Sequence, residues 1–64
     1  HFHYYPEAYQ EKPASFWIDY AQKYGADYIL VQTSEDRNRF LSEGRTELFD
    51  SEGKFSIMKI LSDD

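Results

Sequence analysis

Two histidines near the start of the chain, His1 and His3, have the spacing most suggestive of chemistry. An imidazole at the third position, with a free α-amine and two backbone amides, is a donor set that binds Cu(II) or Ni(II) in a square plane. This hypothesis requires His1 to be the native N-terminus, and copper titration of a peptide with a verified native start tests it. We expect both side chains to be solvated instead, so the sequence predicts no metal and no cofactor.

Four aromatic side chains in the first twelve residues form a second candidate, a binding surface. They are Phe2, Tyr4, Tyr5 and Tyr9. Aromatic rings offer flat contact area, and tyrosine adds a polar tip, which suits a carbohydrate or a peptide. The alternative is an arm that packs back on its own sheet or on a neighbouring domain. Removal of residues 1–12 distinguishes the two. If the arm is a binding surface, its removal abolishes ligand binding and leaves the melting temperature intact. If the arm packs on the domain, its removal makes the fold collapse.

Paired carboxylates are the third group that suggests chemistry, as general acids and bases or as calcium ligands. The pairs are Asp50 and Glu52, Glu35 and Asp36, and Asp63 and Asp64. All of them fall in expected turns or chain ends, where we expect solvated carboxylates, and none has the spacing of an EF-hand loop. The chain also lacks a Gly-x-Ser-x-Gly elbow and a glycine-rich phosphate loop. The sequence therefore predicts no catalytic residue.

Composition narrows the range of functions that the protein could have. The 64 residues include 7 Lys and Arg against 12 Asp and Glu, a formal charge of −5, and aromatic residues make up 19%. Nucleic-acid binding is not expected, because Arg37, Arg39 and Arg45 are interleaved with acidic residues. No apolar run of about 18 residues predicts a membrane span. The first residue is His1, which predicts a cleaved product or a part of something longer.

A helix followed by a strand should position these groups. The spacing of aromatic residues predicts a helix from Pro13 to Tyr24, with Pro in the first turn and Gly25 as the left-handed stop. Asp27 to Thr33 contains an unbroken apolar run, which predicts a central strand covered on both faces.

The second half of the chain predicts a short helix and a hairpin. Thr33 or Ser34 should cap a helix over 35–41, and strands are expected over 46–50 and 55–61. Residues 50–54 suit a type I turn with a bulge at Gly, and the last three residues should fray. The predicted fold is a small two-layer α+β unit, with one main helix on a short sheet that ends in a hairpin.

The predicted organisation is an extended aromatic arm over 1–12 and one α/β domain over 13–64. The predicted core consists of large apolar residues from the main helix and the strands. They are Phe16, Trp17, Tyr20, Tyr24, Tyr28, Leu30, Phe49, Phe55, Ile57 and Ile60.

Two segments carry a family resemblance: Lys-Tyr-Gly-Ala-Asp-Tyr-Ile-Leu-Val over 23–31 and Glu-Leu-Phe-Asp-Ser-Glu-Gly-Lys-Phe-Ser-Ile-Met-Lys-Ile over 47–60. Between Phe16 and Leu61 the chain resembles the soluble C-terminal domain of GT-C-type multi-spanning membrane glycosyltransferases and related membrane proteins. The resemblance implies a closing hairpin and an extracytoplasmic location. It also implies chemistry on acidic loops of the membrane part, so it transfers no catalytic residue to this chain.

The predicted function is accordingly a non-catalytic appendage of a larger glycosyltransferase-like protein, with a structural or acceptor-side role. Its partner would be the parent membrane domain or another protein, with a carbohydrate contact as a further option. The alternative is a free-standing acidic interaction module, an inhibitor or an adaptor, that uses exposed aromatic residues against a basic partner.

Overall fold

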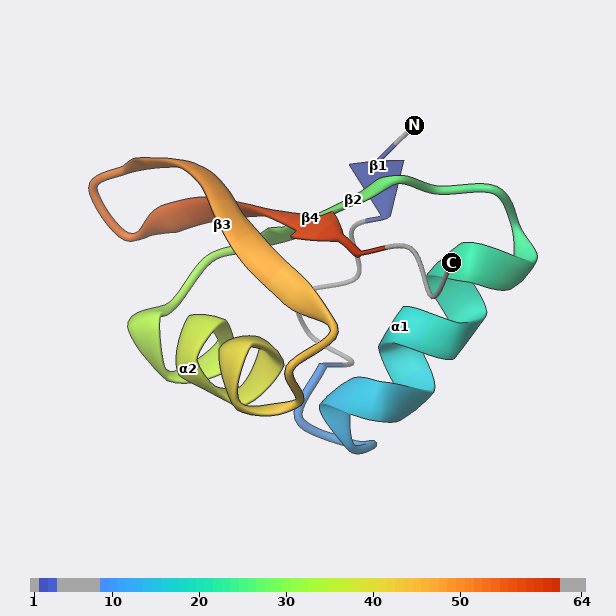
Figure 1. Cartoon of the computed structure of the whole chain (residues 1–64). Helices are drawn as coiled ribbons and strands as arrows, with labels where there is room; N and C mark the ends of the chain where they lie inside the picture. Colours follow the sequence, from blue (N-terminus) through green and yellow to red (C-terminus); the bar gives the residue numbers. More distant parts are fainter. Residues whose placement is uncertain (1, 4–8, 62–64) are drawn as a thin grey trace.

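A four-stranded sheet and two helices make up the computed structural model, which describes residues 2–3 and 9–61 (Figure 1). The sheet order is β1-β2-β4-β3, with β1 parallel to β2 and the other neighbours antiparallel. The predicted α+β unit with a closing hairpin is confirmed. The elements in chain order are β1 (Phe2–His3), α1 (Ala14–Lys23), β2 (Tyr28–Val31), α2 (Ser34–Ser42), β3 (Thr46–Glu52) and β4 (Phe55–Ile60).

Helix α1 has the predicted bounds to within one residue at each end. Pro13 is the N-cap with extended backbone, and Tyr24 is the C-cap. Gly25 follows with φ +76°, a left-handed conformation that suits glycine because it has no Cβ. Lys23 lies in the last turn, where a cation is favourable near the negative end of the helix dipole.

Helix α2 begins at a side-chain cap. The Thr33 Oγ1 atom accepts a hydrogen bond from the Asp36 backbone N–H at 3.1 Å, and Glu35 joins Asp36 in the first turn. This is one of the two caps that the sequence predicts, and it satisfies an otherwise orphan donor. The helix extends one residue beyond the predicted range at each end.

The closing hairpin is tighter than expected. Glu52 pairs with Phe55, so only Gly53 and Lys54 form the loop. Gly53 has φ +60°, and no residue other than glycine has positive φ in the described chain. This is the pattern of a type II′ turn, which matches the twist of antiparallel strands, and it replaces the predicted type I turn with a bulge.

The core lies on one side of the sheet only, because both helices pack there (Figure 1). Successive side chains of β2 and of β4 point to opposite sides of the sheet, and Ile29, Val31 and Met58 point at the helices. We call this side the helix face. The buried apolar residues are Tyr9, Ala14, Trp17, Ile18, Ala21, Ile29, Val31, Phe40 and Met58.

The predicted core was therefore largely wrong, although Trp17 is buried as expected and Tyr20 and Ile60 pack against the core. Residues predicted in the core but exposed are Phe16, Tyr24, Phe49 and Phe55. Three more predicted core residues, which are half-buried on the other side of the sheet, are Tyr28, Leu30 and Ile57. The physical reason is that one covered face buries only every second strand residue, whereas we expected β2 to be covered on both faces.

One residue of the predicted arm, Tyr9, also belongs to the core, whereas residues 10–13 are exposed. The Tyr9 side chain is 0% exposed. Its ring makes edge-on contacts with Trp17 and Phe40, at centroid distances of 5.7 and 5.4 Å. Aromatic pairs in this arrangement add to the stability gained from burial alone. Tyr9 therefore connects α1 to α2 beneath the sheet.

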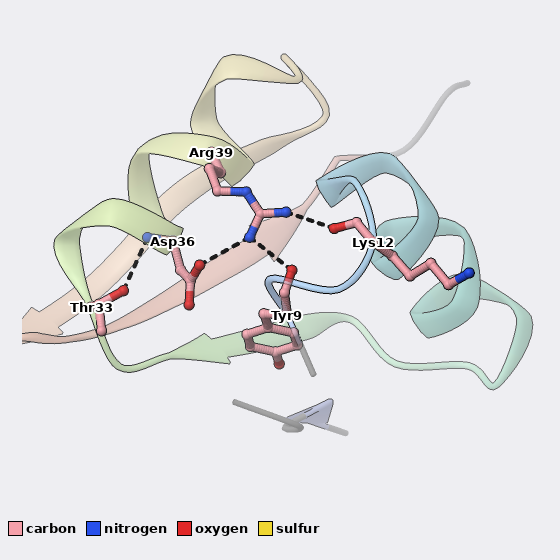
Figure 2. A network of polar contacts seen from close by, with 5 residues as sticks. All are labelled: Tyr9, Lys12, Thr33, Asp36 and Arg39. Carbon is pink, nitrogen blue, oxygen red and sulfur yellow. Dashed lines mark hydrogen bonds and ion pairs between the residues drawn. The ribbon is translucent and has the colours of Figure 1, made fainter. Parts of the chain in front are cut away.

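Arg39 fastens this segment to α2 (Figure 2). Its Nη1 donates to the Tyr9 carbonyl at 2.7 Å and its Nη2 to the Lys12 carbonyl at 2.6 Å. Nη1 also lies 3.0 Å from the carboxylate of Asp36, a buried residue. We expected these charged side chains to be solvated. Instead the guanidinium satisfies a buried carboxylate and two backbone carbonyls at once.

Candidate functional site

The side of the sheet opposite the helices is the best candidate for a functional surface. Neither helix of the described chain lies over it (Figure 1). We call it the open face. Paired residues of an antiparallel sheet share a face, so Leu30 of β2, Ile57 of β4 and Asp50 of β3 form one row across it. Its residues in the described strands are Tyr28, Leu30, Glu47, Phe49, Asp50, Glu52, Phe55, Ile57 and Lys59.

A β-bulge in β3 determines which side chains reach the open face. The pairing shifts between Leu48 and Asp50, so Phe49 is the extra residue. As a result Glu47, Asp50 and Glu52 stand opposite alternate residues of β4, and all three point to the open face. The Phe49 ring lies 5.0 Å from the Tyr28 ring, centroid to centroid. The bulge thus gathers three carboxylates and one aromatic ring along the edge strand.

A hollow of about 140 Å³ opens on this face near the hairpin. Its apolar floor comes from Leu30, Phe55 and Ile57, and its acidic rim from Asp50 and Glu52. We call it the β3 hollow. The Asp50 carboxylate accepts from the Ser51 backbone N–H at 2.8 Å, which holds the carboxylate on the edge strand. The volume equals that of roughly four or five liquid waters, so it has room for one long side chain.

The electrostatics of the open face are one-sided. The described strands place three acids on it and one cation, Lys59. In the strand register, Lys59 stands opposite Glu47 of β3. The whole chain carries a formal charge of −5. An apolar centre with an acidic border can desolvate an apolar partner and attract a cationic one.

Of the predicted aromatic surface, Tyr9 is the residue whose side chain the structure describes. Tyr9 is in the core and cannot contribute to a ligand surface. Phe2 and His3 form β1 and pair by their backbones with Tyr28 and Ile29. His1, Tyr4, Tyr5 and the pair Asp63 and Asp64 lie outside the described residues. The hypotheses of a copper site and of a sugar surface over Phe2, Tyr4 and Tyr5 stay predictions.

The carboxylate pairs separate into two environments. Asp36 is buried against Arg39, whereas its neighbour Glu35 is exposed. Asp50 and Glu52 are exposed and share the rim of the β3 hollow. Of these two described pairs, Asp50 and Glu52 are the one in which both carboxylates lie on an exposed surface.

Sequence reasoning missed the open face because it assigned its apolar residues to the core. A usable signal was present in the hairpin. With a two-residue loop, Glu52 pairs with Phe55 and Asp50 with Ile57, so acidic and apolar residues must share a face. A face that mixes carboxylates with apolar residues cannot be the core of a small domain, because an unpaired buried carboxylate is too costly.

Within residues 2–3 and 9–61, no three His, Cys, Asp or Glu side chains, those of the open face included, are placed so that they could hold one metal ion. In the same residues, neither helix is long and apolar enough to cross a bilayer. Comparisons of the chain with protein-family models, with curated proteins and with solved structures gave no significant match. The class that fold and surface define is a small α+β domain with one open sheet face.

Proposed function

We propose that this chain is a non-catalytic domain that packs its open sheet face on another protein surface, as an appendage of a larger membrane glycosyltransferase-like protein. One observation carries the docking part of the proposal. Apolar side chains of two neighbouring strands, Leu30 of β2 and Phe55 and Ile57 of β4, converge on a face that neither helix covers. Contiguous apolar surface of this kind is characteristic of interaction sites.

The parent protein is inferred from the resemblance between Phe16 and Leu61 and from the closing hairpin, which ends the sheet at β3. The resemblance implies that the domain would lie on the extracytoplasmic side and would steady or shape the acceptor side of the parent. An immunoblot of membrane and soluble fractions from source cells, with an antibody to this segment, tests this part. A large band in the membrane fraction is expected. A soluble band near 7.6 kDa would contradict it.

A second function is favoured by the acidic border of the same face. A free-standing interaction module would use Glu47, Asp50 and Glu52 around the apolar centre to select a basic partner. The soluble band near 7.6 kDa would favour this reading. Both functions need the open face to be covered in the working state.

A photo-crosslinking experiment tests that shared requirement. A benzoyl-phenylalanine replaces Phe55 on the open face or, as the matched control, Phe16 on α1. The two side chains are equally accessible, 43% and 41% exposed, but lie on different sides of the molecule. We expect crosslinks from position 55 in source cells, either within one longer polypeptide or to a separate one, and few from position 16. Equal yields from both positions would refute docking through the open face.

A further inference from the structure

We propose that β3 binds an extended basic segment of the docked protein by strand addition, with a Lys or Arg side chain of that segment in the β3 hollow. This inference rests on the proposed function, because it names the chemistry and the binding mode of the surface that covers the open face. It is argued from the edge of the sheet, the spacing of the acids and the shape of the hollow.

The edge is available for another strand. Among residues 2–3 and 9–61, β3 is the terminal strand of the sheet and pairs only with β4. Over its seven residues, about half of the backbone N–H and C=O groups point away from β4. Leu48 and Phe49 are both exposed on this strand. An incoming strand would satisfy the outer backbone groups and cover these side chains, which is how sheet edges capture extended peptides.

The acids set the chemistry of the incoming strand. Because of the bulge, Glu47, Asp50 and Glu52 stand opposite residues 59, 57 and 55 of β4, a strict two-residue repeat. A neighbouring strand on the outer side of β3 would place alternate residues beside these carboxylates. Opposite charges stabilise such cross-strand pairs, so the segment should carry Lys or Arg at every second position.

The hollow explains why one of these cations should anchor the segment. Leu30, Phe55 and Ile57 provide an apolar floor, and Asp50 and Glu52 stand at the rim. Lys and Arg combine an apolar stem with a charged head and bury the stem on apolar surface. Because β3 lies between the incoming strand and the floor, the stem would cross β3 between the carboxylates of Asp50 and Glu52. The head would then lie at the edge of the hollow near Phe55, within reach of both carboxylates.

A second copy of this chain does not fit the same edge. If two β3 strands paired antiparallel about Asp50, with Phe49 left out of the ladder as it is against β4, Asp50 would lie beside its own equivalent and Glu47 of one copy beside Glu52 of the other. A parallel pairing in register would place each acid beside its own equivalent. Like charges opposite each other are destabilising, and each copy adds a net charge of −5. The acidic edge therefore opposes self-association and favours a basic strand.

The test uses the 64-residue chain and a synthetic peptide, acetyl-Thr-Lys-Val-Lys-Val-Lys-Thr-amide. Two control peptides accompany it: the same peptide with Glu for Lys, and the Lys peptide with alternate backbone nitrogens methylated. The double variant D50N/E52Q tests the carboxylates of the hollow. The variant E35Q/E43Q removes the same charge from exposed acids outside the sheet. Binding is measured by fluorescence anisotropy, and the amides that respond are mapped by NMR.

We expect the Lys peptide to perturb the amides of β3 and those around the β3 hollow. D50N/E52Q should weaken binding about five- to tenfold, and E35Q/E43Q less than twofold. The Glu peptide and the methylated peptide should bind at least tenfold more weakly.

Equal binding of the methylated peptide would overturn strand addition, and equal losses in the two double variants would overturn the role of the β3 hollow. Absence of any binding by the Lys peptide at millimolar concentration would overturn the whole inference. None of these results would change the crosslinking from position 55, so failure of this inference and failure of the proposed function can be told apart.

Discussion

The two faces of one small sheet come from the same strands but differ in burial and in charge. On β2, Ile29 and Val31 are buried under the helices, while their neighbours Tyr28 and Leu30 are half-buried on the open face. On β3, the charged residues all point away from the helices. The comparison indicates that stability is concentrated on the helix face, while the open face can serve binding.

The strongest test of this comparison uses one residue type on both faces. Phe40 is 0% exposed beneath the sheet, and Phe49 is 58% exposed at the bulge. Phe40→Ala should lower the free energy of unfolding by about 3 to 5 kcal/mol, because it leaves a cavity among Tyr9 and its neighbours. Phe49→Ala should cost under about 1.5 kcal/mol, the value of an aromatic contact such as the one with Tyr28.

Urea denaturation followed by circular dichroism measures both losses. A domain of this size has roughly 3 to 10 kcal/mol of stability in total, so Phe40→Ala should populate the unfolded state substantially. Similar losses for the two variants would mean that the open face contributes as much to stability as the helix face.

The next largest effect concerns the charged contact that closes the helix face. Arg39→Ala leaves the Asp36 carboxylate buried without its cation and removes both hydrogen bonds to the segment before α1. We expect a loss on the order of 3 kcal/mol. The matched control is Arg37→Ala, two residues earlier on the same helix. This variant should change stability by about 0.5 kcal/mol or less. Thermal melts of the two variants give the difference. Equal melting temperatures would mean that Arg39 acts only as a surface charge.

A smaller effect is expected at the start of α2, which covers the helix face. Thr33→Ala removes the hydroxyl that caps the Asp36 N–H, and it should cost about 1 kcal/mol. That loss corresponds to a fall of roughly 4 to 8 °C in melting temperature. Thr33→Ser keeps the oxygen and should restore most of the loss. If serine is no better than alanine, the cap does not hold α2 against the sheet.

The smallest effect, of opposite sign, is expected at Ser56 of β4. Its side chain is buried on the helix face, and its hydroxyl has no hydrogen-bond partner among the described residues. Ser56→Ala removes an unsatisfied polar group and should leave stability unchanged or raise it by up to about 1 kcal/mol. The same urea titration resolves a change of this size. A loss above 1 kcal/mol would show that the hydroxyl is satisfied in solution.

The helices and the hairpin could be predicted because their signals are local. Gly25 ends α1, Thr33 begins α2, and Gly53 makes the closing turn. A cap or a turn depends on residues no more than about four positions away, so the chain itself specifies it. The turn type was nevertheless wrong, because the lengths of β3 and β4 depend on their pairing.

The candidate site could not be predicted in the same way. Phe55 and Ile57 are apolar whichever face they occupy, so hydrophobicity alone could not exclude them from the core. Their position follows from the bulge at Phe49 and from the side on which the helices pack. The core position of Tyr9 likewise depends on Arg39, thirty residues later in the chain.

What the sequence by itself determined is the order of the elements from α1 to β4, their approximate bounds and the acidic, cysteine-free character of the chain, whereas β1 lies in the segment that was predicted to be an arm. Only the tertiary structure decided which side of the sheet is buried, that Tyr9 belongs to the core and that Glu47, Asp50 and Glu52 share one face with apolar residues. The physical reason is the difference in sequence distance over which the two kinds of interaction act. Capping and turn formation are local, whereas burial depends on which surfaces far apart in the sequence exclude water from each other.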